Sequence, residues 1–202
     1  MINIAVFASG RGTNFYAIAR GVRRGELKVN LALLVCDNPA AAVLDKARKL
    51  KVKSVLIERK DFAGKQGFEA EIIRLLKENH IDLVVMAGFM RVLSPYFVRS
   101  YADRIINIHP SLLPAFKGAQ GIKDAFDYGA KVSGVTVHFV DEEMDHGPII
   151  LQQAVEIRPK DTPASLEARI HKIEHALYPR AIQLIAQGKV RLKGRKVLLK
   201  CG

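Results

Sequence analysis

The sequence predicts an α/β fold: a single domain with a doubly wound, mostly parallel sheet and an antiparallel extension toward the C-terminus. Short apolar runs alternate with helical patterns over roughly the first half of the chain, as in a parallel sheet with helices on both faces. A glycine-containing turn joins the first strand to the first helix. After Gly134, two strand-like runs follow each other without a helix between them, which favours antiparallel pairing.

In the first half of the chain, the spacing of apolar residues defines the elements. Short apolar runs of the buried type predict strands at residues 2–8, 29–36, 54–57 and 83–87. Helical spacing predicts helices at residues 15–24, 40–50 and 68–79. A fifth strand is expected to end at His109. Because the carboxyl ends of parallel strands meet at one edge, we expect ligand-binding residues there.

In the second half, the same reasoning predicts a helix at residues 122–128 and strands at residues 135–140 and 149–157. Thr162 and Pro163 predict the start of a long helix, with Thr162 as its cap and Pro163 in its first turn. This helix is expected to run to Gly188, with a kink at Pro179. A small hairpin is expected at residues 189–192 and 196–199. No repeat or linker interrupts the chain, so one domain over residues 1–202 is predicted.

Composition narrows the class of protein. The 202 residues are 49% hydrophobic, yet no apolar run reaches the ~18 residues of a membrane span, and residues 1–4 lack the basic n-region of a signal peptide. We therefore expect a cytoplasmic protein without a membrane partner. The cysteines, Cys36 and Cys201, are too few for a disulfide framework and lack metal-ligand spacing. The net charge of +12 is spread along the chain without an RNA-binding aromatic pattern, so no nucleic-acid partner is expected.

Asn107 and His109 form a polar pair in an otherwise apolar strand that stops at Pro110. Residues two apart in a strand leave the same face, roughly 6–7 Å apart. An amide and an imidazole at one point are suitable donors to a carbonyl oxygen that becomes negative during acyl transfer. A turn asparagine beside a buried histidine is the alternative interpretation.

Two further motifs suggest other functions. The turn after the first strand has Gly10 and Gly12, but Phe15 stands where a dinucleotide-binding fingerprint has its third glycine. Asp37, at the end of the second strand, keeps a nicotinamide-dependent enzyme as an alternative. The run from His171 to His175 spells the inverted zinc-protease motif, but a third protein ligand is lacking, so no metal is expected.

Longer motifs then occur in a fixed order. They are AGFMRVLSP at residues 87–95, NIHPSLLP at 107–114, GVTVHF at 134–139, MDHGP at 144–148 and EHALYP at 174–179. On these motifs the chain resembles the phosphoribosylglycinamide formyltransferases, or glycinamide ribonucleotide transformylases, within the folate-dependent formyltransferases. The resemblance covers nearly the whole chain, and several long motifs in order are more specific than any one of them.

The resemblance implies a Rossmann-like formyltransferase fold and an activity in purine synthesis. The formyl group of 10-formyltetrahydrofolate, a co-substrate, would pass to the amine of phosphoribosylglycinamide by direct attack through a tetrahedral intermediate. The N-terminal half would bind the ribonucleotide phosphate, and the C-terminal half would build the folate site. We expect only these small-molecule partners, no metal, and a monomer or homodimer.

The resemblance also implies roles for individual residues. The expected catalytic residues are Asn107, His109 and Asp145, with Asp145 supporting protonated His109 and passing the proton through a water. The expected ribonucleotide-binding residues are Gly12, Thr13, Asn14 and Glu174. The expected folate-binding residues are Lys65, Met90, Arg91, Val92, Leu93, Asn107, Val140, Asp141 and Met144. Ala119 and Gln120 stand where some relatives carry histidines, so no role of those histidines is transferred.

Related activities remain as alternatives. A methionyl-tRNA formyltransferase shares the Asn-x-His motif but needs an additional C-terminal domain for tRNA, which 202 residues do not supply. A formyltetrahydrofolate hydrolase is expected to carry an N-terminal regulatory domain, whereas here the catalytic domain is expected to begin at Met1. A nucleotide-binding module without activity would be expected to lack some of the catalytic residues, which are all present.

Overall fold

The computed structural model describes residues 1–200, so the expectation for Cys201 lies outside the described residues. The chain divides into two compact units, Met1–Ile106 and Asn107–Gly202. Whether the chain is one domain stays a prediction. The strand β5 (Ile105–His109) begins in the first unit and ends in the second, so the expected oxyanion donors belong to the second unit.

The first unit contains a parallel sheet. Its strands are β1 (Asn3–Phe7), β2 (Asn30–Cys36), β3 (Ser54–Leu56) and β4 (Leu83–Met86), in the order β3-β2-β1-β4. Nearly every residue of β1 and β4 is buried, as expected for strands covered on both faces. This explains why their sequences read as continuous apolar runs.

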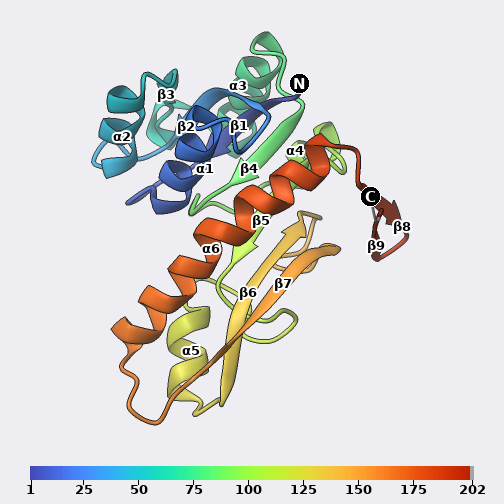
Figure 1. The fold of residues 1–202 in the computed structure, drawn as a ribbon. Coiled ribbons are helices and arrows are strands. Elements are labelled where there is room, and N and C mark those ends of the chain that lie inside the picture. Colours follow the sequence, from blue (N-terminus) through green and yellow to red (C-terminus); the bar gives the residue numbers. More distant parts are fainter. Residues whose placement is uncertain (201–202) are drawn as a thin grey trace. The chain divides into compact units, whose positions relative to one another are not determined.

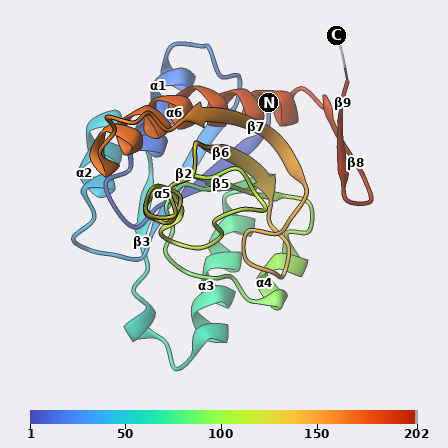
Figure 2. The same ribbon diagram turned by 90° about the horizontal axis from the view of Figure 1, so that it is seen from below.

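Helices cover both faces of this sheet (Figure 2). The helices α1 (Thr13–Arg23) and α2 (Ala42–Leu50) lie on one face, and α3 (Lys65–Glu78) and α4 (Pro95–Ser100) lie on the other. The chain winds outward from β1 through β2 to β3 and then returns to β4, so the winding direction reverses between β1 and β4. Ligands of open α/β sheets bind at such a reversal, beyond the carboxyl ends of the strands.

Two short elements of the first unit were not predicted. One is α4, in which the Ser94 side chain accepts a hydrogen bond from the Phe97 N–H and Pro95 occupies the first turn. The other is the 3₁₀ turn Arg59–Asp61. Both are too short to give a periodic apolar pattern, so only the Ser-Pro pair before α4 marked a helix start.

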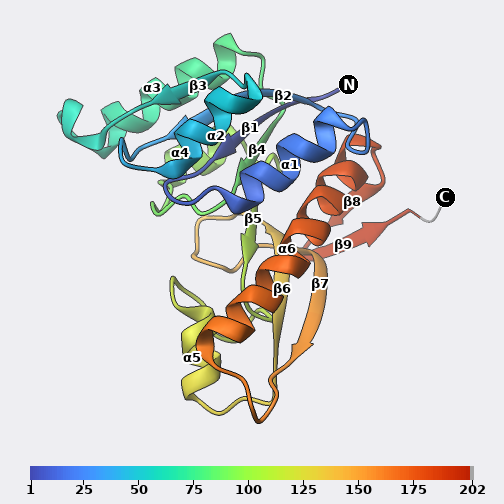
Figure 3. The ribbon, with the colours of Figure 1, turned by 60° about the vertical axis from the view of Figure 1, so that its left-hand side comes forward.

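In the second unit, β6 (Val132–Phe139) pairs antiparallel with β7 (Ile149–Glu156), and the helix α6 (Pro163–Ala186) packs against both strands (Figures 1 and 3). The helix α5 (Gly121–Asp127) contacts α6. The end of the chain forms a separate antiparallel hairpin, β8 (Val190–Lys193) and β9 (Lys196–Leu199). The predicted antiparallel extension and hairpin are confirmed.

The start of α6 is also confirmed. The Thr162 side chain accepts from the Ser165 N–H at 3.2 Å, and the Ser165 side chain accepts from the Thr162 N–H at 3.0 Å, with Pro163 in the first turn. The helix continues past Pro179 to Ala186. The fold is therefore of the predicted α/β class, with mostly parallel strands and an antiparallel part toward the C-terminus. None of the described helices is long and apolar enough to cross a membrane.

Candidate active site

The turn between β1 and α1 brings the N-terminus of a helix to the carboxyl end of β1. Gly12 is the N-cap residue, and its positive φ of 66° belongs to the left-handed region that glycine adopts without strain. A Cβ at Gly12 would lie 2.4 Å from Cγ2 of Val43, so the packing also requires glycine. Gly12 has no side chain to cap the helix, and the first turn contains no acidic residue. Thr13 and Asn14 thus begin a helix whose positive end suits a phosphate.

Beside this turn, the carboxyl ends of β1, β2 and β4 are joined through Asp37. Its carboxylate accepts hydrogen bonds from the Ser9 hydroxyl and from Nε of Arg91. The Ser9 hydroxyl in turn accepts from the Met90 N–H at 3.3 Å. The Asp37 carboxylate already accepts hydrogen bonds from two neighbours, and its side chain is buried. Asp37 is therefore poorly placed to bind a ribose. The nicotinamide-dependent alternative therefore loses its main support.

The segment after β4 exposes apolar side chains. Met90 is 72% exposed and Val92 is 60% exposed, whereas Leu93 is buried. Met90 and Val92 therefore do not pack into the core, whereas Leu93 does. Exposed apolar groups at the reversal of a sheet provide the kind of surface that an aromatic ligand covers. Lys65, at the start of α3, lies 4.0 Å from Oε1 of Glu69, which also accepts from the Ser94 N–H.

In the second unit, the residues expected to be catalytic lie together. Nδ1 of His109, at the end of β5, lies 3.4 Å from Oδ2 of Asp145. Nε2 of His109 donates to the Phe116 carbonyl at 2.8 Å. Nδ2 of Asn107 lies 3.4 Å from Nε2 of His138, which itself lies 3.7 Å from Oδ1 of Asp145. Asp145 therefore stands between two imidazoles, and Asn107 reaches it through His138.

His138 is the member of this cluster that the sequence did not single out. It is buried inside β6, with Nδ1 donating to the Phe139 carbonyl at 2.7 Å. Its Nε2 faces both the Asn107 amide and the Asp145 carboxylate. Nothing in the sequence marks this contact, because the pairing of β5 and β6 alone brings the two side chains together.

Asp145 is held as a carboxylate. Burial raises the pKa of Asp145, but hydrogen bonding to His138, the Gly118 N–H at 2.8 Å and the charge of His109 together bring it below the ordinary value. Its backbone has a φ of 49°, a conformation that aspartate and asparagine adopt more readily than most residues. The residue is thus ionised and oriented by its partners.

The segment from Val140 to Gly147 is a closed loop between β6 and β7. The Phe139 N–H donates to the Pro148 carbonyl at 2.8 Å, which joins the two ends of the loop. A Cβ at Gly147 would lie 1.9 Å from the Phe139 carbonyl oxygen, so only glycine fits there. Within the loop, Nδ1 of His146 lies 2.7 Å from Oδ2 of Asp141. Val140, Asp141, Met144 and Asp145 are all part of this loop.

Glu174 is buried on α6 and bound by a histidine. Nδ1 of His171 lies 2.9 Å from Oε2 of Glu174, and Nε2 lies 3.0 Å from Oε1 of Glu167. The hydrogen bond with Glu174 raises the pKa of His171 above its ordinary value, despite partial burial. An imidazole that donates from both nitrogens is no metal ligand. Among the described residues, no group of three or more His, Cys, Asp or Glu side chains could hold a metal ion.

The predicted site residues thus fall into two sets. The first unit contains the residues expected to bind phosphate together with part of the folate set: Gly12, Thr13, Asn14, Lys65, Met90, Arg91, Val92 and Leu93. The second unit contains the residues expected to be catalytic, Glu174 and the rest of the folate set: Asn107, His109, Val140, Asp141, Met144, Asp145 and Glu174. His109 contacts Asp145 directly, and Asn107 contacts it through His138. The ligand assigned to each residue stays a prediction.

Comparison with known proteins decides the family. The sequence profile described as Formyl transferase matches residues 2–182. The chain belongs to the formyl transferase family. This formyl transferase is 46% identical over 183 residues to the phosphoribosylglycinamide formyltransferase of Bacillus subtilis. The alignment covers 91% of this chain and 94% of that protein.

Solved structures agree with this assignment. The glycinamide ribonucleotide transformylase 1 of Symbiobacterium toebii superposes with a TM-score of 0.97 at 40% identity, covering 100% of this formyl transferase and 95% of that chain. A formyltetrahydrofolate deformylase from Pseudomonas syringae gives a TM-score of 0.92 at 26% identity and covers 99% of this chain. Only 66% of the deformylase chain is matched. The fold is therefore shared by enzymes that transfer and enzymes that remove a formyl group.

Proposed function

We propose that this formyl transferase is a phosphoribosylglycinamide formyltransferase of de novo purine biosynthesis. It transfers the formyl group of 10-formyltetrahydrofolate to the amine of phosphoribosylglycinamide. The cluster of Asn107, His109 and Asp145 is the observation that carries the proposal, because two hydrogen-bond donors and a carboxylate lie together in it, joined by His138. The 46% identity to a phosphoribosylglycinamide formyltransferase over 91% of the chain selects this activity within the family.

The chemistry is a direct acyl transfer. The neutral amine attacks the formyl carbon, the carbonyl oxygen becomes negative, and the folate nitrogen leaves with a proton. The Asn107 amide and His109 donate hydrogen bonds to the oxyanion. Such hydrogen bonds stabilise the transition state most strongly in a buried site. Nε2 of His109 now donates to the Phe116 carbonyl, so the reacting oxygen replaces that acceptor.

Asp145 takes up the proton that the attacking nitrogen loses and returns it to the leaving nitrogen by way of a water. Its carboxylate is ionised, because the pKa of Asp145 is lowered by its hydrogen-bond partners in spite of burial. The negative charge of Asp145 also stabilises a protonated His109 next to the oxyanion. No residue forms a covalent bond to the substrate in this scheme.

The remaining predicted residues bind the two substrates. Gly12, Thr13 and Asn14 hold the phosphate at the start of α1, and Glu174 binds the ribose. The residues expected to bind the folate are Met90 to Leu93 in the first unit and Val140, Asp141 and Met144 in the second, with Lys65 near the glutamate tail. We further expect a cytoplasmic monomer or homodimer with no membrane or nucleic-acid partner.

The test is an assay of the purified protein with 10-formyltetrahydrofolate, followed with and without phosphoribosylglycinamide. We expect the formyl group to be lost only when the amine is present and to appear on the ribonucleotide. Release of formate without the amine would instead assign the deformylase activity of the relative from Pseudomonas syringae. A parallel assay with methionyl-tRNA should give no product.

The phosphate site can be tested at Thr13. Replacing Thr13 with valine removes the hydroxyl and keeps the side-chain volume, so the KM for the ribonucleotide should rise about 10- to 100-fold, as for a lost hydrogen bond to a charged group. The KM for the folate should change little. Thr13→Ser restores the hydroxyl and is the matched control. Equal changes in both KM values would contradict the assignment. Gly12 is less suitable, because any side chain there meets Val43.

A further inference from the structure

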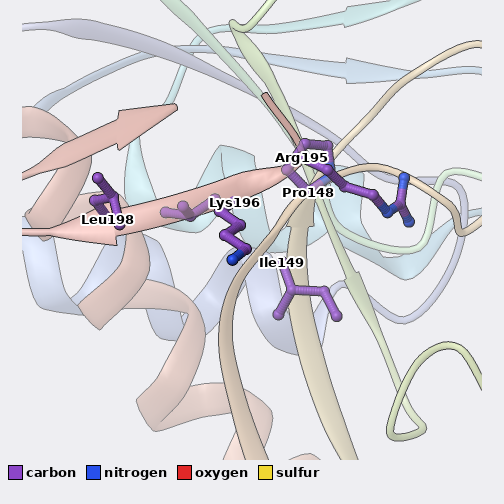
Figure 4. A pocket seen from close by; sticks show the side chains of 6 residues that line it. Pro148, Ile149, Arg195, Lys196 and Leu198 are labelled. Atoms are coloured by element: carbon purple, nitrogen blue, oxygen red, sulfur yellow. The ribbon is translucent and has the colours of Figure 1, made fainter. Parts of the chain in front are cut away.

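The hairpin of β8 and β9 lies after residue 182, where the match to the family profile ends. It rests against the start of β7, and the two segments line a pocket of about 290 Å³ (Figure 4). Pro148 and Ile149 contribute one side of this pocket, and residues 195–198 contribute the other. The hairpin is thus in contact with the strand that follows the loop from Val140 to Gly147.

Arg195, in the turn of the hairpin, binds the end of that loop. Its Nη2 donates a hydrogen bond to the His146 carbonyl. Its Nη1 lies 3.4 Å from Nδ1 of His146, but that nitrogen donates to Asp141 and so cannot accept from arginine. The bond to the backbone carbonyl is therefore the one that holds Arg195 to the loop.

The position of this bond along the loop matters. His146 precedes Gly147, which is in close contact with the Phe139 carbonyl, and Pro148, which accepts from the Phe139 N–H. It also follows Asp145 directly. A guanidinium bound to the His146 carbonyl therefore restrains the peptide unit between the catalytic carboxylate and the closed end of the loop.

Charge favours the same arrangement. The hairpin is basic along its length, and the loop is acidic. The basic residues are Arg191, Lys193, Arg195 and Lys196, and the acidic residues are Asp141, Glu142, Glu143 and Asp145. The opposite charges of the hairpin and the loop favour the contact between them. The loop itself is internally ordered at Asp141, whose Oδ1 accepts from the Glu143 N–H at 3.1 Å.

We propose that Arg195 is a positioning residue of the folate site, which fixes the loop from Val140 to Gly147 by binding the His146 carbonyl from the C-terminal hairpin. The proposal rests on the proposed function, since the loop's part in folate binding is an element of that function. Arg195 acts on the loop through the backbone, so it sets the conformation in which Asp141 and Met144 are presented, whereas Asp145 is held separately by the Gly118 N–H. It takes no part in the chemical step.

The experiment compares Arg195→Ala with Arg195→Lys and Arg191→Ala in the full chain. Arg191→Ala removes the same charge from the same hairpin at an exposed position and is the matched control. We expect Arg195→Ala to raise the KM for 10-formyltetrahydrofolate about three- to tenfold, with the ribonucleotide KM unchanged and kcat within about twofold. Arg195→Lys should recover part of the effect, because the ammonium can still donate to a carbonyl.

Amide hydrogen exchange of residues 140–148 gives a readout that does not depend on activity. Arg195→Ala should speed exchange in this segment, and Arg191→Ala should not. Equal exchange and equal folate KM in wild type and Arg195→Ala, in an enzyme that still formylates the ribonucleotide, would overturn the proposal and leave the proposed function intact. Absence of formyl transfer in the wild type would instead reject the proposed function, while the exchange result would still decide whether Arg195 restrains the loop.

Discussion

Asp145→Asn should lower kcat by at least about 10²–10³-fold while leaving the KM for both substrates nearly unchanged. Asparagine keeps the size of the side chain, accepts from the Gly118 N–H as aspartate does, and tolerates the φ of 49° at this position. The substitution therefore removes the charge between His109 and His138 and little else. Steady-state kinetics with each substrate varied in turn give the two KM values and kcat.

The matched control is Asp103→Asn. Asp103 also has a positive φ, of 59°, but it is an exposed residue of the first unit and is not a member of the cluster. The same change of chemistry at the same kind of backbone position should leave kcat within about twofold. A folded Asp145→Asn enzyme with near-wild-type turnover would mean that the loop serves only to bind the folate.

The pH dependence of this comparison follows from the direction of the Asp145 shift. Because its partners lower the pKa of Asp145 below the ordinary 3.8, the carboxylate stays ionised throughout the neutral range. Its contribution to stability is present above the unfolded-state pKa and is lost only as the pH falls through the lower folded-state value. The ratio of wild-type to Asp145→Asn turnover should thus remain large from about pH 6 to about pH 9. An acid limb of activity in that range belongs to another group.

Gly147→Ala should damage both stability and turnover. The new Cβ would lie 1.9 Å from the Phe139 carbonyl oxygen, and since both atoms belong to backbone, the loop itself must move. Overpacking of this kind costs about 1–3 kcal/mol, which for a chain of this size lowers Tm by roughly 3–10 °C. We also expect kcat to fall more than about tenfold, because Asp145 is only two residues away.

Gly64→Ala is the control for that measurement. Gly64 has an extended φ of 175°, and a Cβ there meets nothing within 4 Å. Its Tm and kcat should match those of the wild type, apart from effects of a few tenths of a kcal/mol. Thermal unfolding and kinetics on the same preparations decide the matter: a Gly147→Ala protein with wild-type Tm would show that the loop end can relax without cost.

The fold was predictable where the signal is local. Thr162 and Pro163 stand side by side in the sequence and form the start of α6 that their chemistry requires. Likewise, the apolar runs of β1 and β4 are continuous because both faces of those strands are covered. The helix α4 escaped notice, since six residues do not complete two helical turns.

The site was predictable only in part, because several of its contacts join residues far apart in the chain. Asn107 and His109 share one short strand, so their alternation was readable from the sequence. The position of His138 beside them depends on how strands pair, and no spacing encodes it. The exposure of Met90 and Val92 also went against their apolar character, which taken alone predicts burial.

Main-chain atoms of the segment around Phe116 hold two members of the proposed catalytic cluster, His109 and Asp145. The Phe116 carbonyl accepts a hydrogen bond from Nε2 of His109, and the Gly118 N–H donates a hydrogen bond to Asp145. Every residue type offers the same carbonyl, so the identity of side chain 116 has no part in these bonds. A substitution of Phe116 that keeps the path of the backbone should therefore leave both bonds in place.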